Sequence, residues 1–315
     1  MFGLVKRLNQ MGILGINSRN ADYILKYNKR KLYPLVDDKL LTKQLAIKFG
    51  INVPELYYVV EVQAQKKNLH AILEKYDDFV IKPAHGSGGD GILVVFGRTK
   101  GMYRKLNGHL LTQDELNYHV SKIISGMYSL GGHPDKALIE YRVKFDPVFE
   151  AISYLGVPDV RVIILLGVPV MSMVRLPTRQ SDGKANLHQG AIGAGIDIVT
   201  GVTLNAVWHN SIVTEHPDTG NSITGINIPN WDALLYLAAS CYELTGLGYQ
   251  GVDIVLDKDK GPMILELNAR PGLNIQIANQ AGLIPRLELV TKYYKELKNI
   301  EARIDFAKNN FKHII

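Results

Sequence analysis

An apolar, β-branched stretch interrupted by a polar turn predicts a β-hairpin over residues 251–272, with its turn at 257–261. A register centred on that turn places Asp253 opposite Glu266, and side-chain alternation points Asn268 the same way as Glu266. Two carboxylates and an amide oxygen without His or Cys suit a hard cation such as Mg²⁺. The hairpin therefore predicts a nucleotide-metal site, and the alternative is a surface hairpin with solvated acids. The expected core-facing residues are Val252, Ile254, Leu265 and Leu267.

A second apolar hairpin is predicted between Asp159 and Arg175, with its turn at 167–169. A three-residue loop there places Arg161 opposite Arg175, with Asp159 two residues away on the same side. Two facing arginines repel each other unless an anion lies between them, and the guanidinium fork suits phosphate or carboxylate. This hairpin therefore indicates an anion site, and ion pairing with Asp159 is the alternative.

Residues 79–97 predict a strand, a glycine loop and a second strand. The loop at 85–91 has four glycines in seven residues, which lets backbone N–H groups approach an anion closely. Because the loop joins two strands and opens no helix, a Walker A loop or a dinucleotide fingerprint is excluded. Lys82 lies among apolar neighbours in the first strand and needs a partner, which a phosphate would supply. The alternative is a mobile hairpin tip with a snorkelling lysine.

The rest of the chain alternates helices with short strands. Apolar spacing and helix-end signals predict helices over 37–50, 66–75, 112–128, 231–247 and 286–315, and strands near 57–60 and 136–143. Residues 180–195 read as a loop in which Asn186, His188 and Gln189 are candidates for substrate contact. A satisfied loop histidine is the preferred interpretation of His188.

Composition is that of a globular protein, with 46% hydrophobic and 21% charged residues. The single cysteine, Cys241, lies in an apolar helical pattern, so it is expected to be a packing residue in a reducing compartment. The longest uncharged apolar run, at 162–174, has 13 residues. That is short of the roughly 20 that a membrane helix needs, so no membrane insertion is expected. No secretory signal is recognisable, and a cytoplasmic location is predicted.

The net charge of +6 is concentrated at the N-terminal end, where residues 1–43 hold nine Lys and Arg against three Asp. A basic arm suits nucleic acid, anionic lipid or an acidic partner, but a solvated basic face is the favoured interpretation. No nucleic-acid-binding signature accompanies the arm, so nucleic acid is not an expected partner.

Taken in order, several motifs resemble those of ATP-grasp carboxylate-amine ligases, most closely the α-L-glutamate ligases that extend ribosomal proteins, with similarity to bacterial glutathione synthetase. The motifs are DKLLTKQLA from Asp38, VIKPAHGSGGDGI from Val80, LIEYRV from Leu138, DVRVIILLG from Asp159, MVRLP from Met173, NLHQGA from Asn186, GVDIV from Gly251 and ILELNARPGL from Ile264. The resemblance implies an α+β ATP-grasp fold, in which two lobes with antiparallel sheets clamp ATP behind a truncated N-terminal domain. The segments it implies are a basic N-terminal arm at 1–36, a lobe with the phosphate loop at 37–145, a lobe with the metal hairpin at 146–285, and a C-terminal helix at 286–315.

The resemblance also implies roles for individual residues. Lys39 and Lys82 contact the α- and β-phosphates of ATP. Asp159 holds the ribose. Glu140 and the backbone of Tyr141 and Val143 line the adenine pocket, and the loop positions are His85, Gly86, Ser87, Gly88, Gly89 and Gly91. Arg161, Arg175 and Asn186 meet the γ-phosphate and the acyl-phosphate, while Asp253, Glu266 and Asn268 hold two Mg²⁺ ions, which Mn²⁺ can replace. Arg270, directly after the ligand strand, is predicted to contact a substrate carboxylate.

The predicted activity is an ATP- and Mg²⁺-dependent ligation that joins a carboxylate, with glutamate favoured, to an amine through an acyl-phosphate. The alternatives are a kinase that uses the same nucleotide site and a non-catalytic ATP-binding module whose arm docks a partner. ATP-grasp ligases usually carry an additional α/β domain before the motif at Asp38, and 37 residues precede it here. We therefore expect either a large amine acceptor, such as a peptide or protein, or a second subunit or partner that completes the cleft.

Overall fold

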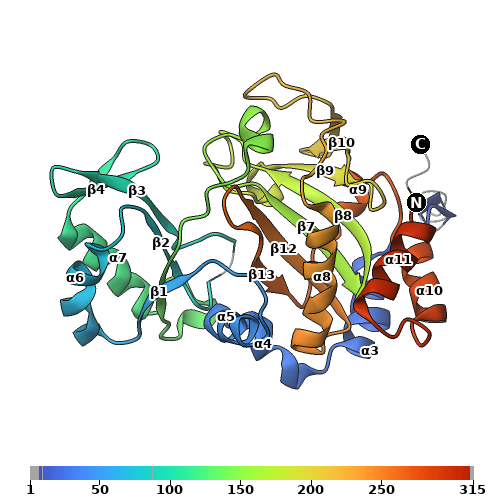
Figure 1. The fold of residues 1–315 in the computed structure, drawn as a ribbon, viewed down its shortest axis with the longest axis horizontal. Coiled ribbons are helices and arrows are strands. Elements are labelled where there is room, and N and C mark those ends of the chain that lie inside the picture. Colours follow the sequence, from blue (N-terminus) through green and yellow to red (C-terminus); the bar gives the residue numbers. More distant parts are fainter. Residues whose placement is uncertain (1–6, 9, 87, 313–315) are drawn as a thin grey trace. The chain divides into compact units, whose positions relative to one another are not determined.

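The computed structural model describes residues 7–8, 10–86 and 88–312, which form two compact units (Figure 1). One unit, here called the glycine-loop unit, comprises Asp38–Gln44 and Val53–Val143. The other, here called the hairpin unit, comprises Met1–Asp37, Leu45–Asn52 and Lys144–Ile315. Each unit is built around one antiparallel sheet.

The glycine-loop unit contains a six-stranded sheet in the order β1-β6-β2-β3-β4-β5. Helix α7 opens with the predicted capping box, in which the Thr112 side chain accepts from the Glu115 backbone N–H. The apolar face of α7 packs on β2 and β6, and its buried residues join the strands in one core. The elements are β1 Leu56–Val60, a 3₁₀ turn η3 Gln63–Asn68, α6 Leu69–Leu73, β2 Phe79–Pro83, β3 Leu93–Thr99, β4 Met102–Lys105, β5 Leu110–Leu111, α7 Gln113–Ile124, a 3₁₀ turn η4 Leu130–Gly132 and β6 Ala137–Glu140.

The hairpin unit contains a seven-stranded sheet in the order β11-β10-β9-β8-β7-β12-β13. Central strands β7, β8 and β12 are almost wholly buried, because α8 and α11 pack on the sheet and α9 contacts β8, β9 and β10. The elements are a 3₁₀ turn η5 Pro147–Ile152, β7 Asp159–Leu165, β8 Val168–Leu176, a 3₁₀ turn η6 Leu187–Gln189, β9 Ile192–Ile196, β10 Thr203–Trp208, β11 Ser211–Val213, α8 Trp231–Thr245, β12 Tyr249–Asp257, β13 Gly261–Asn268, α9 Ile275–Ala278, α10 Ile284–Tyr293 and α11 Ile300–Asn310.

The N-terminal segment forms a series of short helices. They are α2 Ile16–Ser18, a π-helical turn η1 Arg19–Ile24, α3 Leu25–Tyr27, a 3₁₀ turn η2 Arg30–Leu32 and α4 Pro34–Asp37, followed by α5 Lys39–Lys48. Helices this short are not stable alone, so tertiary contacts hold them. Gln276 supplies one such contact, since its side chain accepts from the Leu14 N–H and donates to the Leu14 carbonyl.

The metal-type hairpin forms with the predicted turn and with Asp253 opposite Glu266, so that register is confirmed. One detail is wrong. Asp253 pairs with Glu266 and Ile254 pairs with Ile264, so Leu265 is the extra residue of a β-bulge. Leu265, which was predicted to face the core, is therefore only half-buried, and Ile264 takes that core position instead.

The second hairpin has a different register from the predicted one. Strands β7 and β8 are joined by a two-residue turn at Leu166 and Gly167, with φ of 50° and 82°. Two consecutive left-handed residues match the twist of the flanking strands, which favours this turn over a three-residue loop. A bulge between Ile163 and Ile164 shifts the pairing further, so Arg175 lies opposite Asp159, and Arg161 lies opposite Met173.

Two other predictions are corrected. The segment 180–195 is a loop only as far as residue 191, because β9 begins at Ile192. The small residues of β9 let α9 approach the strand closely, since a Cβ on Gly195 would lie 2.6 Å from the Ala278 carbonyl oxygen. The C-terminal region forms two helices, since the Asn299 side chain caps α11 and separates it from α10. Cys241 is fully buried, as predicted. In the described part of the chain, no helix is long and apolar enough to cross a membrane.

Candidate functional site

A buried cluster of two lysines and one glutamate lies in the glycine-loop unit. The Glu140 carboxylate, on β6, is 2.5 Å from the Lys82 Nζ and 3.0 Å from the Lys43 Nζ. All three side chains are about 95% buried. Burial alone raises the pKa of Glu140, but Lys82 and Lys43 outweigh it and hold that pKa below its usual range. Lys82 is thus a buried, paired ammonium, and the snorkelling alternative is wrong.

The cluster carries one more positive than negative charge. Burial lowers the pKa of Lys43, against the opposing effect of Glu140. The Lys43 Nζ also donates to the Pro54 carbonyl. Lys43 was not predicted, although it follows Lys39 by one helical turn on α5 and therefore lies on the same helix face. A surplus ammonium in a buried position suits an anionic ligand.

The glycine loop is anchored at both ends. His85 donates its backbone N–H to Asp135, and its Nδ1 lies 2.7 Å from the same carboxylate, whose side chain is fully buried. At the other end, the Gly91 carbonyl oxygen is 2.9 Å from the His119 Nε2. Gly91 has a φ of +76°, and a Cβ there would lie 2.6 Å from the Tyr128 ring. The loop therefore needs glycine at this position.

One of the other predicted loop positions, Gly86, contacts α5. The Lys39 Nζ donates to the Gly86 carbonyl oxygen at 2.5 Å, so Lys39 reaches the loop. Gly88 and Gly89 also have left-handed backbone conformations. Ser87 lies outside the described residues. Asp135 is a second residue that was not predicted; its only signal is an acid two residues before a buried strand.

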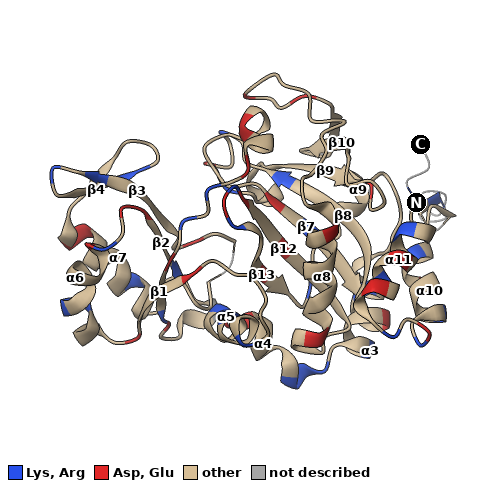
Figure 2. Cartoon of the chain, viewed as in Figure 1, with Lys and Arg blue, Asp and Glu red and all other residues tan. Residues whose placement is uncertain are grey.

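In the hairpin unit, two arginines converge on one carboxylate (Figure 2 colours the charged positions). Arg161 makes a forked contact with Asp253, with Nε–Oδ1 and Nη2–Oδ2 distances of 2.7 and 2.6 Å. Arg175 makes a second forked contact with Asp159, both distances being 2.5 Å, and its Nη2 reaches the Asp253 Oδ2 at 2.8 Å. The anion between the two arginines is thus Asp253, a carboxylate of the chain itself, and the alternative of an ion pair between Arg175 and Asp159 is confirmed.

The two aspartates of this cluster titrate differently. Burial raises the pKa of Asp159 to about 6, against the stabilising effect of Arg175, and the charge on Asp253 acts in the same direction as burial. Burial also acts to raise the pKa of Asp253, but Arg161 and Arg175 outweigh it and lower that pKa to about 2. Asp253 therefore remains charged throughout the physiological range, while Asp159 loses its charge in mild acid.

The predicted metal ligands lie together on β12 and β13. Glu266 is directly across from Asp253, and the Asn268 Nδ2 donates to the Asp253 Oδ2 at 3.2 Å. In the described residues, no group of three or more His, Cys, Asp and Glu side chains has the arrangement of a metal site. The candidate set instead has two carboxylates and one amide oxygen, which fits Mg²⁺ because that ion keeps several waters and binds few protein ligands. Asp253 is the most constrained member, because it already accepts from two guanidiniums.

The remaining predicted residues occupy loops and strand ends. Asn186 caps η6, because its Oδ1 accepts a hydrogen bond from the His188 backbone N–H. Both residues belong to the loop that precedes β9. The Arg270 guanidinium lies over the Tyr33 ring, 5.2 Å from its centroid. The Tyr141 backbone N–H donates to the Glu55 carbonyl oxygen. Val143 and Tyr141 are both buried.

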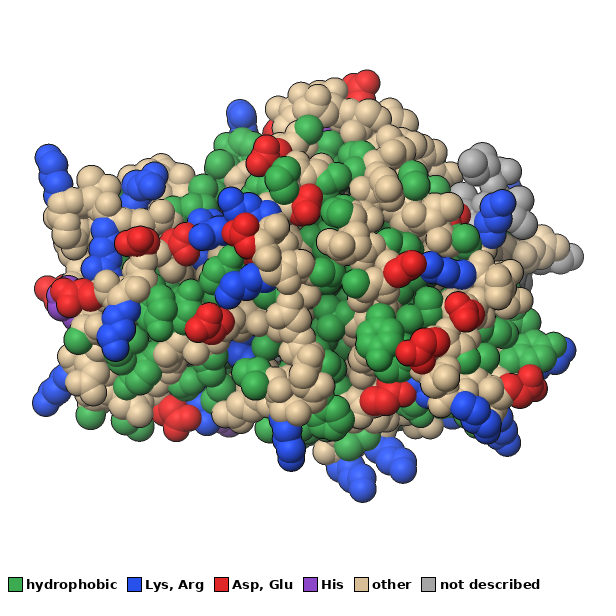
Figure 3. Space-filling model, viewed as in Figure 1, with side chains coloured by type: hydrophobic (Ala, Val, Ile, Leu, Met, Phe, Trp, Pro, Cys, Tyr) green, Lys and Arg blue, Asp and Glu red, His purple; other side chains and the backbone are tan. Residues whose placement is uncertain are grey.

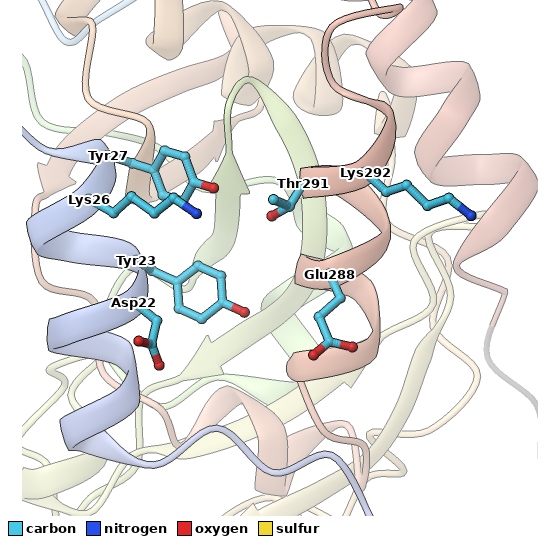
Figure 4. Close-up of a pocket in the computed structure, with 7 residues that line it drawn as sticks. All are labelled: Asp22, Tyr23, Lys26, Tyr27, Glu288, Thr291 and Lys292. Atoms are coloured by element: carbon cyan, nitrogen blue, oxygen red, sulfur yellow. The ribbon is translucent and has the colours of Figure 1, made fainter.

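A surface pocket of about 310 Å³ lies elsewhere in the hairpin unit, between η1 and α3 on one side and α10 on the other (Figure 4). Its lining comprises Asp22, Tyr23, Lys26, Tyr27, Glu288, Thr291 and Lys292. Burial, with the charges of Glu288 and Asp22, raises the pKa of Tyr23 to about 12, so its hydroxyl stays protonated. None of the predicted site residues lines this pocket, and its four charged side chains are exposed to solvent.

Basic side chains also project from the N-terminal helices (Figure 3). Lys26, Lys29, Arg30 and Lys31 are all exposed. A solvated basic face and a partner-binding arm both predict such exposure, so the role of the N-terminal arm stays a prediction.

Comparisons with known proteins identify one family. A family model described as sugar-transfer associated ATP-grasp matches residues 18–292. Among the curated proteins, none matches. Similar solved structures include the ATP-grasp ligase PsnB complexed with a minimal precursor, at 15% identity and a TM-score of 0.47, with 89% of this chain and 62% of that chain covered. The chain thus spans less than two thirds of PsnB.

Two further structures are comparably similar. D-alanine–D-alanine ligase from Bacillus anthracis, complexed with ATP, is 15% identical with a TM-score of 0.45, over 88% of this chain and 70% of that chain. The D-cycloserine synthetase DcsG is 14% identical with a TM-score of 0.46, over 86% of this chain and 74% of that chain.

Proposed function

This chain belongs to the sugar-transfer-associated ATP-grasp family and has the ATP-grasp fold, and we propose that it uses Mg·ATP to join a carboxylate to an amine. The observation that carries the proposal is the convergence of Arg161 and Arg175 on Asp253, directly across the hairpin from Glu266. Guanidiniums and oxygen ligands in one buried group are what phosphoryl transfer requires, because the protein mainly positions and neutralises phosphate oxygens.

In the glycine-loop unit, Lys39 and Lys82 are assigned to the α- and β-phosphates of ATP. Three observations support it: the surplus positive charge around Glu140, the contact of Lys39 with the loop, and the left-handed glycines of the loop. Glu140, with the backbone of Tyr141 and Val143, is assigned to the adenine. Asp159, in the hairpin unit, is assigned to the ribose. Because its carboxylate already makes a forked contact with Arg175, it would bind the Arg175 guanidinium and the ribose hydroxyls at the same time.

In the hairpin unit, Arg161, Arg175 and Asn186 are assigned to the γ-phosphate. Asp253, Glu266 and Asn268 would hold Mg²⁺, which neutralises phosphate charge when bound. Two guanidiniums already surround Asp253, so Glu266 and Asn268 provide the more accessible oxygens of the set. Arg270 is assigned to a carboxylate of the acid substrate.

The proposed reaction has two steps. A carboxylate oxygen of the acid attacks the γ-phosphorus, the bond to the β,γ-bridging oxygen breaks, and ADP leaves. An amine nitrogen then attacks the carbonyl carbon of the acyl-phosphate, phosphate leaves with the C–O bonding electrons, and the nitrogen loses a proton. Arg161 and Arg175 neutralise charge on the transferred group in both steps, and no nucleophilic side chain is needed.

The test is phosphate release from Mg·ATP by the purified protein, with product masses recorded in parallel. L-glutamate is the first acid on the panel because of the motif resemblance. Amino sugars join amino acids and peptides as acceptors because the family is described as sugar-transfer associated. Acid-dependent release, with a product mass equal to acid plus amine minus water, is expected. A phosphorylated product with ADP and no free phosphate would identify a kinase instead.

A further inference from the structure

The N-terminal segment, residues 10–37, is bonded to the residues that follow the metal-type hairpin. Asn28 is 4% exposed and uses both ends of its amide. Its Nδ2 donates to the carbonyl oxygens of Tyr249 and Ala269 at 2.6 and 3.1 Å, and its Oδ1 accepts from the Tyr249 N–H at 2.9 Å. A buried amide that is satisfied in this way fixes the backbone around it. Asn28 therefore ties the start of β12 to the residue directly after Asn268.

Two further contacts from the same segment reach the next two residues of the chain. The Tyr33 ring lies under the Arg270 guanidinium, at 5.2 Å. The Arg19 Nη1 donates to the Pro271 carbonyl oxygen at 2.8 Å. Three separate points of the N-terminal segment thus hold three consecutive residues, 269–271.

These contacts cover the sheet face that carries Asp253. The pairing of β12 with β7 is regular from Tyr249 to Ile254, so Tyr249, Gly251 and Asp253 point to the same face. Pro271 lies over that face, because a Cβ on Gly251 would be 2.7 Å from the Pro271 Cβ. The hydroxyl of Tyr249 is buried there and has no hydrogen-bond partner in the described part of the chain. Pro271, which Arg19 of the N-terminal segment contacts, therefore lies over one end of the face that carries Asp253.

Arg270 is positioned but not neutralised by these contacts. Its side chain is exposed, and among the described residues no acid pairs with it. A guanidinium that packs its flat face on an aromatic ring keeps its edge for a forked contact with a carboxylate. We propose that Tyr33, supported by Asn28 and Arg19, positions Arg270 to bind a carboxylate of the acid substrate other than the one that is phosphorylated. The N-terminal segment then selects dicarboxylic acids, an inference that rests on the proposed function.

The experiment compares Tyr33→Leu with Tyr33→Phe, which keeps the ring, and with Tyr242→Leu. Tyr242 is the matched control because Arg303 lies over its ring at the same distance of 5.2 Å, away from the candidate site. Two readouts are recorded for each variant. One is the KM for L-glutamate, the KM for ATP and kcat in the phosphate-release assay. The other is the rate at which phenylglyoxal, an arginine reagent, labels Arg270, measured by peptide mass spectrometry.

Tyr33→Leu is expected to speed the labelling of Arg270 and to raise the KM for L-glutamate by about two- to fivefold, the range of an exposed cation–π contact. In Tyr33→Leu, the KM for ATP and kcat should stay at wild-type values. In the controls Tyr33→Phe and Tyr242→Leu, all the kinetic constants and the labelling rate of Arg270 should stay at wild-type values. Unchanged labelling in Tyr33→Leu, or faster labelling with an unchanged KM for L-glutamate, would overturn the inference. If no acid stimulates phosphate release, the proposed function fails, and the labelling rates alone then decide whether Tyr33 positions Arg270.

Discussion

Arg161 lies directly across from Asp253 on the neighbouring strands β7 and β12, and its guanidinium grips that carboxylate with two hydrogen bonds. Arg175 reaches the same carboxylate while it grips Asp159. Two positive and two negative charges therefore share one buried group. A ligand with negative charge can compete for the arginines only against carboxylates that are already in place, which suits a highly charged group such as a triphosphate.

The shared guanidinium predicts how stability depends on pH. The pKa of Asp159 in the folded state is about 6, above the ordinary value for an aspartate. Between about pH 4 and about pH 6 the folded state therefore binds more protons than the unfolded state, and the free energy of unfolding falls as pH rises through that range. Relative to Asp159→Asn, the free energy of unfolding of the wild type should fall on the order of 2 kcal/mol over that range. Urea unfolding midpoints at successive pH values measure the difference. Asp305→Asn, at an exposed helix position, is the control.

Asp253 acts in the opposite direction. Its folded pKa of about 2 is below the ordinary value, so its contribution to stability is fully present above about pH 4 and is lost as pH falls towards 2. A difference between wild type and Asp159→Asn that stays constant from pH 4 to pH 6 would contradict the assigned pKa of Asp159.

The strand register of this group shows what the sequence can and cannot specify. The pairing of Asp253 with Glu266 could be predicted because a polar turn with a glycine fixes both strand ends. The pairing of Arg161 and Arg175 could not, since a two-residue turn and a bulge each displace the register. Bulges depend on which strands lie alongside, and β7 is paired on both edges. Leu265 was misassigned for the same reason.

The N-terminal segment was the least predictable part of the chain. Its helices are too short to produce a clear apolar period, and their stability comes from single long-range contacts such as those of Asn28 with Tyr249 and Ala269. The partners are more than 200 residues apart in sequence. Lys43 was missed because a lysine in a helix is ordinarily exposed, and only the fold shows that it is buried beside Glu140.

Glu266→Gln tests the metal assignment. The amide keeps the size of the side chain and removes the charge that a hard cation requires, so Mg²⁺-dependent phosphate release should fall by about 100-fold or more, while the unfolding midpoint stays near that of the wild type. The matched control is Glu288→Gln, an exposed acid on α10. EDTA should abolish release by the wild type, and added Mg²⁺ should restore it. Undiminished turnover by Glu266→Gln would remove Glu266 from the ligand set.

The buried lysine-glutamate cluster predicts a contrast between two variants. Glu140→Gln leaves two buried ammoniums without their carboxylate, which should cost about 3–5 kcal/mol. Lys43→Met leaves the contact of Glu140 with Lys82 in place and removes a buried charge, so the free energy of unfolding should change by only about 1 kcal/mol. Lys136→Met breaks an exposed pair with Glu61 and should have less effect still. Equal losses for Glu140→Gln and Lys43→Met, measured by urea unfolding, would show that the cluster does not act as described.

The glycine loop provides the last prediction, because two glycines with the same backbone conformation differ in their surroundings. Gly91 and Gly101 have φ of +76° and +77°, so an alanine at either position should cost about 1–2 kcal/mol of backbone strain. Only at Gly91 does the added Cβ meet another group, the Tyr128 ring at 2.6 Å, whereas nothing lies within 4 Å at Gly101. Gly91→Ala must therefore shift the loop as well as strain it.

Gly91→Ala should consequently lose more stability than Gly101→Ala, and it alone should weaken nucleotide binding. If the loop closes over the phosphates, Gly91→Ala should raise the KM for ATP on the order of tenfold, because displaced N–H groups no longer point at the anion. Gly101→Ala should leave the KM unchanged. Calorimetric titration with Mg·ATP separates binding from turnover. An unchanged affinity in Gly91→Ala would exclude the loop from the phosphate site, since the Tyr128 ring leaves no room for the native backbone once a methyl group is added.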